Sequence, residues 1–186
     1  MTRTAKFLLT AAALGIAAPA FAAVVVVGNT SARLCYEAAD SKLHPRPADF
    51  DRCDEAFERE NLNRRDLVAT YVNRGILKFK VRNYDSALQD FDKALAIDPD
   101  QAEGYLNKAA TLLRLPGGSA DALPLFSTAI AKKTQRPAIA YYGRAIANEL
   151  NGNIKQAYLD YRMASRLDPT WDDPQNELAR FTVRQP

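Results

Sequence analysis

The sequence contains a single histidine, His44, and offers little for catalysis. A Ser–His or Cys–His pair would have to use this histidine, which lies in the proline-containing stretch HPRP. The chain has no glycine-rich phosphate loop, no HExxH motif and no GxSxG motif. One histidine and one pair of cysteines do not supply the four ligands of a structural zinc site. We therefore expect no enzyme activity, no metal and no cofactor.

Long apolar runs are also missing, except at the N-terminus. Residues 7–27 form an uncharged stretch of 21 residues behind the basic Arg3 and Lys6. The tripeptide Ala20-Phe21-Ala22 puts small residues at the two positions that a signal peptidase inspects. We expect residues 1–22 to be a signal peptide cleaved after Ala22, and the protein to be periplasmic or secreted in a bacterium. The alternative is an uncleaved anchor, because 21 uncharged residues are long enough to span a bilayer.

In the residues that follow the predicted signal peptide, basic and acidic side chains are nearly equal in number. Removing Arg3 and Lys6 from the 25 basic residues leaves 23, against 22 acidic residues. A polyanion partner needs a concentrated positive field, which this balance does not provide. The one local basic excess, within 102–137, is interpreted as a solvated helix face. We expect no nucleic-acid partner, and no stable membrane insertion unless the N-terminal segment is retained.

Only two cysteines are present, Cys35 and Cys53, and they are 18 residues apart. In an oxidising compartment such a pair indicates a disulfide. Closing a loop of this size stabilises a fold by about 3 kcal/mol. Two free thiols, or half of a metal site, are the weaker alternatives.

Small and aromatic residues recur with a period of 34–36. Within 84–99, 119–134 and 154–169, an aromatic residue follows an alanine by four positions and precedes another by three. These spacings put all three side chains on one helix face. The equivalent sets are Ala87, Phe91 and Ala94; Ala122, Phe126 and Ala129; and Ala157, Tyr161 and Ala164. Upstream, Tyr71, Tyr105 and Tyr141 precede the small residues Gly75, Ala109 and Ala145. A period of this length, made of two helical patterns, indicates stacked helix hairpins.

With these residues the chain resembles a tetratricopeptide repeat (TPR) protein. The matching positions are an aromatic residue and a small residue on the first helix, Ala-aromatic-Ala on the second, and a closing proline at Pro99 or Pro169. The resemblance implies three repeats at 68–101, 102–137 and 138–171. The fold class that follows is all-α, a right-handed superhelical stack of TPR hairpins.

The middle repeat departs from this pattern. It has an extra residue in its Pro-Gly-Gly turn, and Thr134 stands where the closing proline belongs. Pro124 lies within its second helix, where it is tolerated if Asp121 is the N-cap and is more disruptive if Ser119 is. We therefore expect this helix to be the least regular of the array.

The outermost hairpins of a stack have a neighbour on one side only, so their other apolar face must be covered by a different structure. Residues 23–64 are interpreted as a degenerate repeat in the form of a disulfide-bonded hairpin, because Cys53 and Phe57 lie 34 residues before Ala87 and Phe91. Residues 172–186 are expected to supply a capping helix near 174–183.

The TPR resemblance also implies a concave groove lined by the first helix of each repeat. In this sequence its candidate binding residues are Asn73, Ile76, Lys80, Asn107, Arg114 and Tyr142. Apolar side chains with amide donors suit a peptide or helix segment of another protein.

We therefore expect an exported adaptor that mediates protein–protein interaction. Two alternatives remain: a small enzyme or ligand binder with a site in the N-terminal hairpin, and a structural spacer whose own helix fills the groove.

Overall fold

The computed structural model describes residues 21–26 and 30–181, and the described chain is entirely helical apart from turns and extended connections. The nine helices of the described residues are α1 (Ser31–Asp40), α2 (Pro47–Arg59), α3 (Arg64–Lys80), α4 (Tyr84–Ile97), α5 (Ala102–Leu112), α6 (Ser119–Ala131), α7 (Pro137–Leu150), α8 (Ile154–Leu167) and α9 (Asp172–Leu178). In this part of the chain, none of the helices combines the length and the apolar character that a membrane crossing requires. The expected signal peptide falls almost wholly on residues 1–20, which lie outside the described residues.

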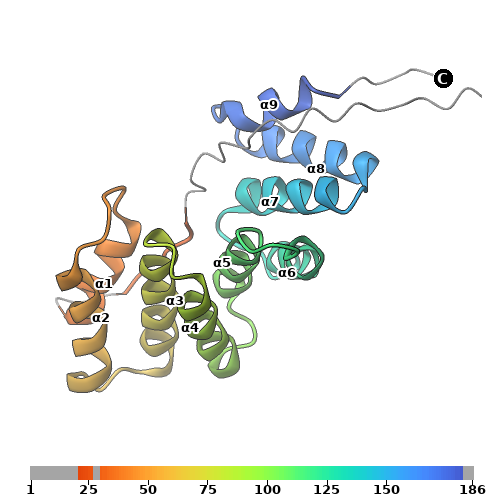
Figure 1. The fold of residues 1–186 in the computed structure, drawn as a ribbon. Coiled ribbons are helices and arrows are strands. Elements are labelled where there is room, and N and C mark those ends of the chain that lie inside the picture. Colours follow the sequence, from red (N-terminus) through yellow and green to blue (C-terminus); the bar gives the residue numbers. More distant parts are fainter. Residues whose placement is uncertain (1–20, 27–29, 182–186) are drawn as a thin grey trace, which may run out of the picture.

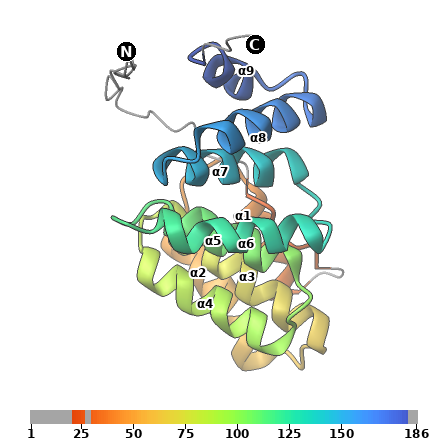
Figure 2. The same cartoon turned by 90° about the vertical axis from the view of Figure 1, so that its right-hand side faces the viewer.

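The helices pair into hairpins that stack in chain order (Figures 1 and 2). α3 packs on α4, α5 on α6 and α7 on α8, while α1 and α2 lie at one end of the stack and α9 at the other. The prediction of an all-helical stack with a disulfide-bonded N-terminal hairpin is confirmed.

Helix ends follow the local chemistry of the sequence. The Asn63 side chain accepts a hydrogen bond from the backbone N–H of Asp66 and so caps α3. α4 and α8 end immediately before Asp98-Pro99 and Asp168-Pro169, where the prolines exclude further helix. α9 begins two residues before the expected start and ends at Leu178; the last two residues of the expected helix, 182 and 183, lie outside the described range.

α6 starts earlier than either cap that the sequence suggested. Its N-cap is Gly118, which has no side chain to bond the first turn, and Ser119 is already helical. Pro124 therefore lies inside the helix, where it provides no N–H for the carbonyl group one turn back. Pro124 thus lies one residue further into the helix than it would with Ser119 as the cap.

Small residues of the repeats lie buried where neighbouring helices pack against each other. Ala87, Ala122 and Ala157 are completely buried. A methyl group added at Gly75 would lie 2.5 Å from the ring of Phe91, and one added at Gly143 would lie 2.4 Å from the ring of Phe126. The rings occupy the space that larger side chains would need. Residues that are one repeat apart in the sequence therefore make equivalent contacts between helices.

Cys35 on α1 and Cys53 on α2 form a disulfide across the N-terminal hairpin, with their Cα atoms 4.9 Å apart. Both cysteines are completely buried. The bond joins the two helices that have no further repeat on their outer side, so it supplies covalently part of the stability that stacking gives elsewhere.

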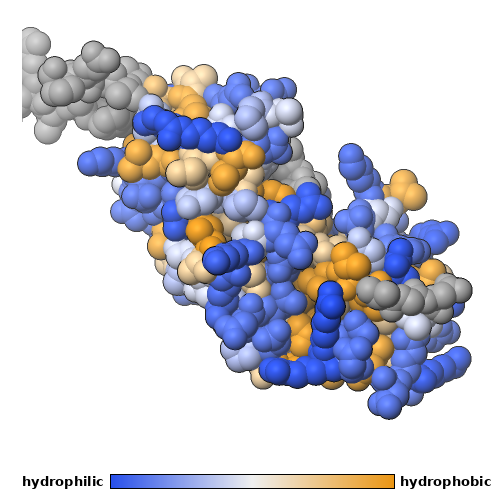
Figure 3. All heavy atoms as spheres, turned by 180° about the vertical axis from the view of Figure 1, so that it is seen from behind, coloured by the Kyte–Doolittle hydropathy of each residue, from blue (hydrophilic) through white to orange (hydrophobic). Residues whose placement is uncertain are grey.

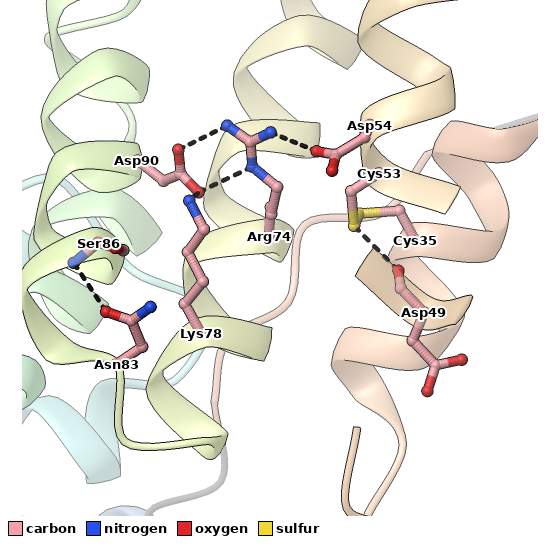
Figure 4. A network of polar contacts seen from close by, with 9 residues as sticks. All are labelled: Cys35, Asp49, Cys53, Asp54, Arg74, Lys78, Asn83, Ser86 and Asp90. Carbon is pink, nitrogen blue, oxygen red and sulfur yellow. Dashed lines mark hydrogen bonds and ion pairs between the residues drawn. A yellow bond between two sulfur atoms is a disulfide. The ribbon is translucent and has the colours of Figure 1, made fainter. Parts of the chain in front are cut away.

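A buried ion-pair network links the N-terminal hairpin to the first repeat (Figure 4). The Arg74 guanidinium donates two hydrogen bonds, of 2.9 and 2.8 Å, to the Asp90 carboxylate, which is 1% exposed. Lys78 Nζ lies 2.7 Å from the same carboxylate, and Arg74 also donates to Asp54 on α2 at 2.5 Å. Burial alone would lower the pKa of Arg74, but its bonds to Asp90 and Asp54 raise it, so the guanidinium remains charged.

A buried arginine–aspartate pair like that of Arg74 and Asp90 recurs in the third repeat, and the second repeat has none at the equivalent position. Arg144 binds Asp160 with two bonds of 2.9 and 2.7 Å, 70 residues after Arg74 and Asp90. In the middle repeat the position equivalent to Asp90 is Leu125. The middle repeat is therefore built with one fewer buried ion pair and with the proline described above.

Asp90→Ala should lower the free energy of unfolding by about 3 kcal/mol, because it leaves the Arg74 and Lys78 charges without their buried partner. Asp92→Ala is the matched control, since Asp92 is 57% exposed in its pair with Lys108 and its loss should cost less than about 1 kcal/mol. Urea denaturation followed by circular dichroism measures both values. Equal losses in the two variants would contradict the structural role given to Asp90.

The variant with both Cys35→Ser and Cys53→Ser should lose about 3 kcal/mol of stability, because the unfolded chain regains the freedom of the closed loop. The same urea titration of the unmodified protein, with and without dithiothreitol, gives an independent measurement. A reduced protein as stable as the oxidised one would refute the stabilising role of the bond.

Candidate functional site

A segment of the chain itself lies against the first helices of the first two repeats, where the sequence predicts a groove. Residues 21–26 have no helical structure and run from the start of α1 across α3 to α5 (Figure 1, red-orange). The Val24 backbone N–H donates to Asn73 Oδ1 at 2.9 Å, and Asn73 Nδ2 donates to the Val24 carbonyl oxygen at 2.8 Å. This reciprocal pair is the contact that one strand residue makes with another in an antiparallel sheet.

A second asparagine binds the same segment two residues earlier. Asn107 Nδ2 donates to the carbonyl oxygen of Ala22 at 3.3 Å. Residues two apart in an extended chain face the same side, so both bonded groups point at the helices. Asn73 is completely buried and Asn107 is 2% exposed, and buried amides of this kind require partners.

Side chains of the segment fill separate sites along the groove. The Phe21 ring packs edge-on against the Phe79 ring, with centroids 4.6 Å apart. Ala22, 3% exposed, joins the apolar cluster around Leu106 and Ala109. At the other end Val26 is 1% exposed and packs with small residues of three helices, Ala32, Ala56 and Ala69.

The Lys80 side chain binds the N-terminal hairpin and is not free to bind an external ligand. Its Nζ donates to the carbonyl oxygens of Ala39 and Ser41, both at 2.6 Å, and so satisfies the end of α1. Burial lowers the pKa of Lys80, and the charge of Asp40 opposes that shift. The same ammonium lies 5.9 Å from the centroid of the Phe21 ring, so it contacts both the hairpin and the segment.

The remaining predicted residues lie in the core or around a small pocket. Ile76 is completely buried within the core of the first repeat. Arg114 and Tyr142 line an apolar pocket of about 30 Å³ together with Leu113, Ile139 and Ile146. The Arg114 guanidinium lies 5.7 Å from the Phe79 ring centroid, on the ring that Phe21 contacts. The structure thus brings Asn73 and Asn107 onto the segment and places Arg114 and Tyr142 at the pocket.

Sequence reasoning missed the segment itself. In the sequence this segment is part of the uncharged stretch 7–27, which predicts a signal peptide or an anchor, although its valines also favour extended backbone. The paired Asn73 and Asn107, one repeat apart, were the available signal for a main-chain ligand.

On the face of the molecule seen in Figure 3, apolar side chains do not form one continuous patch. In the rear view, orange patches alternate with charged residues, and the larger patches lie low in the picture, where the N-terminal helices are (Figure 3). Within 21–26 and 30–181 no group of three or more His, Cys, Asp and Glu residues has the arrangement of a metal site. His44 is exposed, in the connection between α1 and α2.

The C-terminal end of the stack carries a partly buried carboxylate. Glu177 Oε2 lies 3.0 Å from Arg180 Nε but has no well-oriented hydrogen bond among the described residues. Burial raises the pKa of Glu177; Arg180 opposes this shift, and Glu149 and Asp173 add to it. Trp171, the single tryptophan of the chain, packs nearby against Tyr142 with ring centroids 4.6 Å apart.

Comparison with known proteins identifies the repeat and the fold. Residues 68–101 match the family model described as Tetratricopeptide repeat. A search of curated proteins gives no match to the chain. Among solved structures, one titled "MamA RS-1 ArsTM double mutant" has a similar fold, with a TM-score of 0.62 and 21% sequence identity over 81% of this chain and 82% of that chain. At this identity the likeness concerns the fold alone.

Glu177→Gln should raise the urea concentration at which the C-terminal end of the stack unfolds at pH 7. This gain in stability should disappear as the pH falls toward the ordinary pKa of a glutamate side chain. The native state binds more protons than the unfolded state between that value and the raised pKa of Glu177, so wild-type stability falls as pH rises through this window. Fluorescence of Trp171 reports the transition, and Glu58→Gln on exposed α2 surface is the control. A difference between variant and wild type that stays constant with pH would contradict the assignment.

Proposed function

We propose that this tetratricopeptide repeat protein is an exported adaptor that binds an extended segment of another protein in its groove, by reversible contacts and without bond chemistry. The observation that carries the proposal is the reciprocal pair of hydrogen bonds between the Asn73 side chain and the backbone of Val24. An asparagine used in this way recognises main chain and tolerates many side chains.

The burial of the two asparagines explains why an occupant is needed. An amide that loses its partners inside a protein costs about 1–3 kcal/mol. The groove is therefore stable when an extended chain pairs with Asn73 and Asn107, and less stable when it is empty. A partner binds by taking the place of all or part of residues 21–26.

Two features support function outside the cytoplasm. The sequence begins with the three parts of a signal peptide. The disulfide between Cys35 and Cys53 persists in an oxidising compartment and not in a reducing one. A periplasmic or secreted adaptor is consistent with both.

A second candidate is a structural spacer. Its support is the position of the residues that follow the predicted cleavage site: Val24 satisfies Asn73 and Val26 is buried, both within the same chain. In that function the groove is a packing surface, and no external segment displaces its occupant.

Capture of proteins from periplasmic extract separates the two candidates. The variant with Asn73→Ala and Asn107→Ala should lose a specific captured protein at least about tenfold, because two paired amides contribute about 1 kcal/mol or more each. The variant with Asn61→Ala and Asn176→Ala, two exposed positions on other faces, should retain it. Mass spectrometry of the eluates measures the ratio.

Asn107→Ala alone provides a milder test, because Asn73 is the more buried residue and its loss affects folding more. Circular dichroism melting confirms that each variant is folded before capture. If the wild type, the groove variants and the control all captured the same amount of protein, the proposal that the groove binds a partner would be contradicted. The structural spacer would then be the remaining candidate.

A further inference from the structure

The outer face of α8 carries a row of large apolar side chains that are exposed to solvent. Leu159, Met163 and Leu167 are 42%, 37% and 45% exposed, and they follow one another at intervals of four residues. This spacing places them along one side of the helix, over a length of about 12 Å. Ala157 and Ala164 of the same helix are completely buried in the core that α8 forms with α7 and α9, so the exposed row lies on the side away from that core (Figure 2).

A row of arginines runs beside the apolar row. Arg162 and Arg166 are also four residues apart, and neither lies within ion-pair distance of an acidic side chain in the part of the chain that the structure describes. The only carboxylate of α8, Asp160, is already bound by Arg144. The outer face of α8 therefore has an uncompensated positive charge next to its apolar row.

A surface pocket of about 280 Å³ lies over these two rows. It is lined from α8 by Leu159, Met163 and the two arginines, and from α7 by Tyr141 and Arg144. The pocket combines an apolar floor with basic groups at its rim. It therefore suits an apolar side chain of a partner that has carboxylates nearby.

The other two repeats show that the stack does not need these side chains. The residues equivalent to Leu159, Arg162, Met163 and Arg166 are Gln89, Asp92, Lys93 and Ala96 in the first repeat, and Pro124, Ser127, Thr128 and Ala131 in the second. Both of those hairpins pack without large aliphatic side chains or arginines at these positions. Packing within the chain therefore does not account for the apolar and basic rows of the third repeat, whereas methionine and arginine are both enriched in protein interfaces.

We propose that the outer face of α8 is a second docking site, and that it binds an amphipathic helix of another protein in which an acidic row runs beside the apolar row. This inference goes beyond the proposed function, which concerns the groove lined by the first helices of the repeats.

The shape and the charge of the face both identify the partner. Residues four apart form a ridge, and a ridge of this kind packs into the groove between the corresponding rows of another helix. Carboxylates beside the apolar row of the partner would lie next to Arg162 and Arg166, whereas a basic helix would be repelled by them. An acidic amphipathic helix is therefore the segment that matches both rows at once.

The test uses the purified protein and two fluorescently labelled synthetic helices. The first probe has leucines on one face and glutamates at all other positions, and the second has glutamines in place of the glutamates. Fluorescence anisotropy at an ionic strength of about 0.01 M should show the glutamate probe binding about tenfold more tightly than the glutamine probe. The difference should shrink at about 1 M, because salt screens exposed charges.

The variants take residues from the other repeats, which already fit a hairpin of this stack. Leu159→Gln combined with Met163→Thr should weaken binding of the glutamate probe at least about tenfold, because it removes the centre of the apolar row. Arg162→Ser combined with Arg166→Ala should remove most of the preference for the glutamate probe over the glutamine probe. Circular dichroism melting confirms that both variants are folded.

Two control variants separate this face from the rest of the molecule. Lys42→Ser combined with Arg65→Ala removes two exposed charges elsewhere and should leave the affinity for both probes unchanged. The groove variant with Asn73→Ala and Asn107→Ala should also bind the glutamate probe as the wild type does. Failure of the second docking site is therefore distinguishable from failure of the groove.

Three results would overturn the inference. The first is a glutamate probe that does not bind, or that binds no more tightly than the glutamine probe. The second is unchanged binding by the variant with Leu159→Gln and Met163→Thr. The third is a different occupant of the face, shown if this variant abolishes an association of the wild type with itself in sedimentation velocity, or with phosphatidylglycerol vesicles.

Discussion

The structure depends on a contact between an aromatic ring and a small residue. Phe91, Phe126 and Tyr161 are almost completely buried, and the rings of Phe91 and Phe126 occupy space that exists because Gly75 and Gly143 stand opposite. Interiors packed to this density do not accept an added methyl group without movement. The contact sets the distance between helices, the distance sets the stacking of hairpins, and the stacking brings asparagines from successive repeats into one line.

That line of asparagines gives the groove its chemistry. Asn73 and Asn107 are one repeat apart in sequence, and they bond the backbone of residues two apart in an extended chain. A repeat protein thus presents main-chain binding groups at regular intervals without building a sheet. The N-terminal hairpin is linked to the same groove, because Lys80 bonds the end of α1 and lies near Phe21.

Most of the fold could be predicted from the sequence, because its period reflects contacts that recur in each repeat. The disulfide could be predicted because two cysteines, in a sequence that starts like a signal peptide, have few other uses. The sequence singles out Asn73 and Asn107, but not the segment that they bond: an extended segment has no periodicity, and its burial depends on helices up to 85 residues away. The cap of α6 was also wrong, since the helix begins after Gly118 and not after Ser119 or Asp121. The buried pair of Arg74 and Asp90 was missed, although it recurs 70 residues later.

The uneven middle repeat has a consequence for how the array comes apart. α6 contains Pro124, lacks a side-chain cap and belongs to the repeat with Leu125 in place of a buried carboxylate. In a linear array each unit is held only by its neighbours, so the weakest unit decides where continuity is lost. Under heat or tension the solenoid would divide at its centre, leaving a disulfide-bonded half that keeps Asn73 and a second half closed by α9.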